Sequence, residues 1–139
     1  IHVAETLAGE HPPLVRQENI TRCIYTRLEA ASIGLSEEQA KEAGYDVKVT
    51  QSAFQGNAKA LIKGENEGII KLVIDQTYGE ILGAFMVGPH ATDLIGEVLG
   101  VKASEGTIYE LSEIIQPHPA LLEAIGEGAD AYFGSAIHM

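Results

Sequence analysis

The chain has 139 residues, 45% of them apolar, and its 9 Lys+Arg against 20 Asp+Glu give a net charge of −11. This length suits one domain with a short appendage, and the apolar fraction excludes wholesale disorder. No apolar run is long enough to cross a membrane, and the negative charge argues against binding to nucleic acid or anionic lipid. The single cysteine, Cys23, excludes an internal disulfide, a Cys-based zinc site and a dithiol redox pair within the chain.

The first segment has the pattern of a helix end followed by a linker. Residues 1–10 resemble the last turns of an amphipathic helix that ends at Gly9, since glycine is the usual residue at a helix C-terminus. His11-Pro12-Pro13 then breaks regular structure, and we expect a linker up to about Asn19. No secretory signal is recognisable, so a reducing, cytoplasmic location is expected.

Strand patterns dominate the middle of the chain. The β-branched and aromatic residues of 20–25 predict a strand, and the alternation over 46–54 predicts a half-buried one. Between them, Ser36 and Gln39 form a capping box that opens a short helix ending at Ala43. Two apolar runs, 69–74 and 81–87, flank a turn-like stretch and predict an antiparallel hairpin.

The C-terminal third changes to helical periodicity. Apolar residues at helical spacing over 91–99 predict one helix, and a capping box at Thr107 opens a second that carries Leu111, Ile114 and Ile115. Pro119 suits the first position of a last helix. Strands followed by helices predict an α+β fold, with an antiparallel sheet and helices packed on one side.

One motif could carry chemistry. The chain has no glycine-rich nucleotide loop and no metal-ligand spacing among its histidines, but Pro117 and Pro119 flank His118 five residues before Glu123. A histidine held this stiffly before a helix is presented outward, and the Glu123 carboxylate could accept a bond from one ring nitrogen. That is the outline of a general-base pair. The spacing also fits a plainer interpretation, in which the motif is only a helix entry.

Residues 117–123 resemble the C-terminal His-Pro-x-x-x-Glu signature of the flavin-dependent pyridine nucleotide–disulfide oxidoreductases. Further stretches resemble the same family in its order: an entry strand, a first interface helix, a short basic turn and a hairpin, at residues 23–26, 31–40, 57–60 and 79–88. The resemblance covers residues 15–139 and is strongest to the dihydrolipoamide dehydrogenases. It identifies 15–139 as the interface (dimerisation) domain and 1–14 as the tail of an FAD-domain helix with its linker.

The resemblance implies a role in trans for the histidine motif. In this family the FAD domain carries the redox-active disulfide, and the interface domain builds a homodimer and lends its His–Glu pair to the partner's active site. By this comparison His118 is the general base that takes a proton from dihydrolipoamide, with NAD as the final oxidant, and Glu123 orients it. The backbone at His118 and Pro119 would face the partner's flavin, with a cis peptide bond between them.

The resemblance also implies limits and leaves alternatives. FAD and NAD belong to the full-length enzyme, so the isolated chain is expected to bind neither and to be inactive. The lipoyl domains of 2-oxo acid dehydrogenase complexes are the implied partners, and no metal site is expected. Gln116 stands where the family often has a second histidine. Two alternatives remain: a free-standing dimerisation or binding module without catalysis, and the interface domain of another disulfide reductase of the family.

Overall fold

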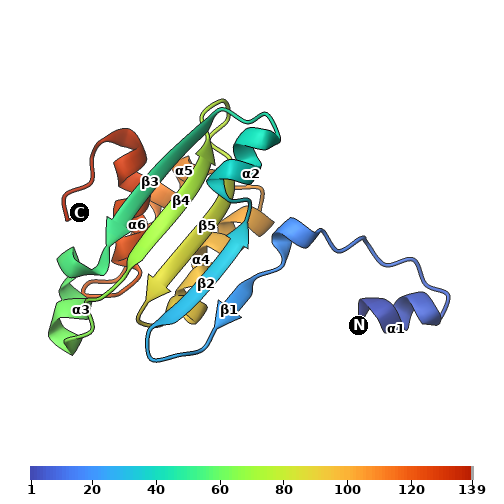
Figure 1. Ribbon diagram of the computed structural model, residues 1–139, viewed down its shortest axis with the longest axis horizontal. Helices are drawn as coiled ribbons and strands as arrows, with labels where there is room; N and C mark the ends of the chain where they lie inside the picture. The colour runs from blue at the N-terminus through green and yellow to red at the C-terminus, as the bar shows by residue number, and fades with distance from the viewer. Residues whose placement is uncertain (139) are drawn as a thin grey trace.

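The computed structural model describes residues 1–138 and is built around a five-stranded antiparallel sheet (Figure 1). Its strands are β1 (Arg22–Ile24), β2 (Glu29–Gly34), β3 (Val47–Ala53), β4 (Ile69–Asp75) and β5 (Ile81–Gly88). Their order across the sheet is β1-β2-β5-β4-β3. The predicted hairpin is confirmed as the β4–β5 pair at the centre of the sheet, and the predicted strands over 20–25 and 46–54 are confirmed as β1 and β3.

Helices cover mainly one face of this sheet. The helices of the described chain are α1 (His2–Leu7), α2 (Glu37–Glu42), α3 (Ala58–Lys63), α4 (Ala91–Ala103), α5 (Ile108–Glu113) and α6 (Glu123–Phe133), with 3-10 turns η1 (Gln17–Asn19) and η2 (Phe54–Gly56). Helices α4, α5 and α6 lie together behind the sheet in Figure 1, whereas the short α2 lies on the opposite face. The predicted α+β class is confirmed.

The hydrophobic core lies between the sheet and helices α4 to α6. Apolar side chains from β4 and β5 meet those of the three helices, and most are fully shielded from solvent. The fully buried members of this core include Phe54, Ile70, Leu72, Ile74, Ile81, Val98, Ile108, Leu111 and Ile125. A smaller hydrophobic cluster of Ala40, Val73 and Leu82 packs α2 against the other face of the sheet.

Strand β3 turns its polar face toward helix α6. Thr50 and Ser52 are buried there, and their hydroxyls donate to the carbonyl oxygens of Gly128 and Ala124 at 2.7 and 2.5 Å. The predicted alternation is therefore correct, but the small hydroxyl side chains, not only the apolar ones, face a packed layer. Their size lets the helix backbone approach the strand closely.

The boundaries of three predicted elements are wrong. Residues 31–34, assigned to a first interface helix, belong to strand β2, because pairing with both β1 and β5 outweighs the helix preference of a segment rich in alanine. Helix α5 ends at Glu113, so Ile114 and Ile115 lie outside it. The last helix begins at Glu123 rather than at Pro119.

Local capping signals are confirmed where the sequence shows them. Ser36 and Thr107 each form the predicted capping box at the start of α2 and α5. Helix α1 has no buried residue and lies apart from the sheet at the end of an extended segment (Figure 1). Within residues 1–138, none of the helices has the length and apolar content needed to cross a bilayer.

Candidate active site

The segment between α5 and α6 carries His118 at the surface. Its side chain is 71% exposed, and the His118–Pro119 peptide bond is cis, as the resemblance implied. Pro117 and Pro119 are exposed as well. The two prolines fix the backbone on either side of the histidine, so the imidazole is held away from the core.

Glu123 bonds both to His118 and to the backbone of the same segment. Its Oε1 lies 2.8 Å from Nδ1 of His118, and its Oε2 accepts from the backbone N–H of Ala120, also at 2.8 Å. Glu123 is the first residue of α6, where the helix dipole favours a negative charge. One carboxylate thus orients the imidazole and closes the turn that presents it.

The surroundings of Glu123 keep its carboxyl ionised. Partial burial acts to raise its pKa, but the Ala120 N–H, the ring of His118 and the charge of His138 together hold the pKa below its usual range. A carboxylate only accepts hydrogen bonds, so Nδ1 of His118 carries a proton and Nε2 is left for exchange with a ligand. Within residues 1–138, Nε2 of His118 makes no hydrogen bond.

Asn57 also holds the turn between His118 and Glu123 in place, through a hydrogen bond from the start of α3. This residue is buried at the start of α3, where its Oδ1 accepts from Ala60 N–H at 2.9 Å. Its Nδ2 donates to the carbonyl oxygen of Ala120, also at 2.9 Å. Sequence reasoning missed this residue as part of the site. The available signal was an asparagine in front of a short helical pattern, which predicts a cap but not a second, distant bond.

Gln116 joins the same turn to α4. Its Nε2 donates to Oε1 of Glu97 at 2.8 Å, and the other carboxylate oxygen of Glu97 is buried without a partner among the described residues. Burial raises the pKa of Glu97, and the bond from Gln116 offsets this only in part. The amide that replaces a histidine frequent in the family therefore keeps a structural contact.

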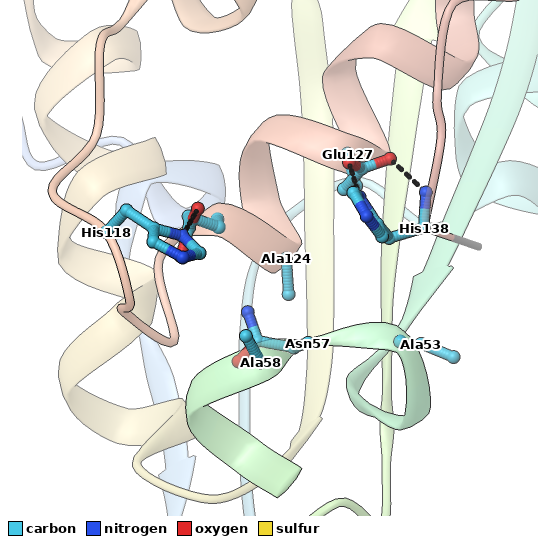
Figure 2. Close-up of a pocket in the computed structure, with 9 residues that line it drawn as sticks. Ala53, Asn57, Ala58, His118, Ala124, Glu127 and His138 are labelled. Atoms are coloured by element: carbon cyan, nitrogen blue, oxygen red, sulfur yellow. Dashed lines mark hydrogen bonds and ion pairs between the residues drawn. The ribbon is translucent and has the colours of Figure 1, made fainter. Parts of the chain in front are cut away.

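A small cavity of about 80 Å³ lies beside this pair. It is bordered by His118 on one side of Ala124 and by His138 on the other, with Asn57 and Ala58 below (Figure 2). His138 is bonded through Nδ1 to Glu127 at 3.0 Å, so a second His–Glu pair borders the cavity. This pair could not be predicted from local spacing, because its two residues lie eleven positions apart.

The arrangement is suited to proton transfer. A neutral imidazole with Nδ1–H held by a carboxylate can take a proton at Nε2, and the carboxylate stabilises the cation that forms. The predicted contact between His118 and Glu123 is thus present, and Pro119 adjoins it. Among residues 1–138, no three or more His, Cys, Asp or Glu side chains are grouped so as to hold a metal ion.

Comparison with known proteins places the chain in a wider context. Residues 20–129 match the family model described as pyridine nucleotide-disulphide oxidoreductase, dimerisation domain. A dihydrolipoyl dehydrogenase from Bacillus subtilis is 44% identical over 138 residues, and one from Zymomonas mobilis is 40% identical over 136. These matches cover 99% and 97% of this chain but only 29% of each relative, so the chain spans about three tenths of their length.

Solved structures share the fold at lower sequence identity. LpdA from Mycobacterium tuberculosis superposes with a TM-score of 0.82 at 22% identity, over 94% of this chain and 28% of that one. The HOCl-induced flavoprotein disulfide reductase RclA from Escherichia coli gives a TM-score of 0.80 at 23% identity, over 92% and 30%. At this identity the likeness establishes the fold.

Proposed function

The chain belongs to the pyridine nucleotide-disulphide oxidoreductase family as its dimerisation domain, and we propose that it is the interface domain of a flavin-dependent dihydrolipoamide dehydrogenase. The observation that carries this proposal is the His118–Glu123 pair at the protein surface, with Nδ1 bonded and the imidazole side chain exposed. The naming of the relatives as dihydrolipoyl dehydrogenases supports the choice of substrate.

In the proposed reaction His118 acts as the general base. Its Nε2 takes the proton of a dihydrolipoamide thiol, which raises the fraction of thiolate that attacks the enzyme's redox disulfide. The carboxylate of Glu123 keeps Nδ1 protonated and stabilises the imidazolium until the proton leaves. Two thiols become a disulfide, and the two electrons and one proton reach NAD, which leaves one proton for the solvent.

This chain could contact FAD or NAD bound by other domains, but it could not enclose either cofactor itself. The cavity beside His118 is about 80 Å³, well below the roughly 300 Å³ at which ligand pockets begin, so it cannot enclose a flavin. When bound to the other domains, the flavin would supply electron transfer between the reduced form of the redox disulfide and NAD. The residues of this chain that would face it are His118 and Pro119, which are exposed and joined by a cis peptide bond.

The same proposal also covers the oligomeric state, the two segments of the chain and the partners. The pair works in trans, on the active site of the second subunit of a homodimer. Residues 1–14, which include helix α1 with no buried residue, are the tail of an FAD-domain helix and its linker, and 15–139 are the interface domain. The partners of the whole enzyme are the lipoyl domains of 2-oxo acid dehydrogenase complexes in the cytoplasm, and this chain alone has no turnover.

Replacement of the base in the full-length protein tests the proposal. His118→Gln should lower kcat/KM for dihydrolipoamide by about 10²- to 10⁴-fold, the range of a lost general base, with an unchanged flavin spectrum. His11→Gln, an exposed histidine in the linker, is the matched control. A loss below tenfold would refute the assignment. A full-length protein without flavin would instead leave a dimerisation module.

A further inference from the structure

The second His–Glu pair fixes the segment that follows α6 beside the first pair. Glu127 accepts Nδ1 of His138 at 3.0 Å through Oε1, while its Oε2 accepts the backbone N–H groups of Ile137 and His138 at 2.7 and 3.0 Å. The Glu127 side chain is only 18% exposed. Three hydrogen bonds to one carboxylate are a built attachment, not a chance surface contact.

The fold directs this segment back over the cavity. Helix α6 ends at Phe133, and the left-handed φ of 75° at its C-cap, Gly134, reverses the chain. The chain after α6 then runs back beside the helix to His138 (Figure 2), whose backbone lies against Gly56 of turn η2. A Cβ added to Gly56 would lie 2.5 Å from the carbonyl oxygen of His138, so glycine at 56 makes room for the segment.

Both pairs share one charge environment. Glu123 and Glu127 lie one turn apart on α6, where two like charges repel each other. The opposite wall, Ala53, Gly56, Asn57 and Ala58, carries no charge, and Ala124 lies between the pairs. The charged groups around Glu123 are therefore His118, Glu127 and His138. The pKa of Glu127 is also below its usual range, because the bonds from His138 and Ile137 outweigh its partial burial.

We propose that the segment after α6 forms one wall of the His118 cavity through His138, and that His138 is a positioning residue, which sets the charge felt by the His118–Glu123 pair. The inference rests on the proposed function and extends it. A cationic His138 offsets the repulsion between Glu123 and Glu127 and opposes uptake of a proton by the first pair. The substrate would then approach an imidazole bordered on one side by the segment that carries His138.

One experiment displaces the wall without changing any charge. Gly56→Ala introduces only a methyl group that collides with His138, and Gly100→Ala, where a Cβ meets nothing within 4 Å, is the control. In the full-length protein, hydrogen exchange at the amides of Ile137 and His138 should accelerate at least about tenfold in Gly56→Ala and stay unchanged in Gly100→Ala. Unchanged exchange in both variants would overturn the wall.

A second experiment tests the charge. His138→Gln should move the acid limb of the kcat/KM profile upward by about 0.3–1 pH unit, because loss of a cation makes proton uptake by the His118–Glu123 pair easier. His138→Lys restores a cation and should return the limb toward its original position. An acid limb that stays in place in His138→Gln would overturn the positioning role.

The two proposals fail in different ways. If His118→Gln retains activity, the proposed function is wrong whatever happens at His138. If His118→Gln is inactive but Gly56→Ala changes neither exchange nor kcat/KM, the general base stands and the wall does not. With both correct, Gly56→Ala should lower kcat/KM by about three- to tenfold, the range expected for coupled neighbours.

Discussion

The hydroxyl of Ser52 donates a hydrogen bond of 2.5 Å to the carbonyl oxygen of Ala124, the residue that follows Glu123 in helix α6. One turn further along, Thr50 makes the same kind of bond to Gly128 at 2.7 Å. Strand β3 thereby fixes where α6 lies along the sheet. Because Glu123 begins this helix, the same two bonds help to fix the position of the carboxylate that holds His118.

Removal of these hydroxyls should destabilise the fold. Ser52→Ala and Thr50→Val each lose a buried hydrogen bond to a helix carbonyl, and each should lower the free energy of unfolding by about 0.5–1.5 kcal/mol. Gln51→Ala, at an exposed position of the same strand, is the control and should have little effect. Urea denaturation followed by circular dichroism gives the three values, and an unaffected double variant would contradict the argument.

Glu123 should contribute a pH-dependent part of the stability. Its pKa is lowered in the folded protein, so its contribution is present above the ordinary value of 4.5 and is lost as the pH falls through the folded value. Glu123→Gln should therefore be less stable than the parent at pH 6, with the difference shrinking toward pH 3. Denaturation at several pH values measures it. Glu38→Gln, at an exposed position of α2, is the control.

The contribution of Glu97 to stability should depend on pH in the opposite direction to that of Glu123. Burial raises its pKa above 4.5, so the folded protein holds this proton more tightly than the unfolded chain. Its contribution to stability is present below the ordinary value and is lost as the pH rises through the folded one. Glu97→Gln removes this term, so the stability of the variant should fall less than that of the parent between pH 4.5 and pH 7. Parallel profiles would show that the buried oxygen finds a partner.

The surface next to His118 should take part in self-association. Ile115 is 98% exposed, three residues before the histidine that we propose to act on a second subunit. An exposed isoleucine at this place is expected to be covered in the dimer. Ile115→Glu should weaken dimerisation of the full-length protein at least about tenfold in analytical ultracentrifugation. Tyr78→Glu, an equally drastic change at an exposed turn residue, should leave the dimer intact, and equal effects would locate the interface elsewhere.

Much of the fold could be predicted from short-range patterns. The β4–β5 hairpin and the capping boxes at Ser36 and Thr107 depend on neighbouring residues, so the sequence displays them directly. Strand β2 could not be predicted, because its extended form depends on pairing with β1 and with the distant β5. The burial of the Thr50 and Ser52 hydroxyls could not be predicted for the same reason, since their partner helix lies more than 70 residues away.

The candidate site also contains some contacts that could be predicted from nearby residues and others that depend on the fold. His118 and Glu123 are five residues apart, and two prolines restrict the path between them, so their contact could be anticipated. Asn57 and His138 reach the site only through the fold. Asn57 is separated from Ala120 by 63 residues, and His138 requires the chain reversal at Gly134. No local pattern indicates either contact.

The two bonds of Asn57 give one side chain two separable duties. Its oxygen caps α3, a role that a carboxylate fills equally well, whereas its amide nitrogen holds the Ala120 carbonyl, a role that only a donor can fill. Deamidation to aspartate would preserve the cap and place a negative charge against a carbonyl oxygen. Chemical ageing at this residue would therefore loosen the turn that carries His118 while the helix beside it stays folded.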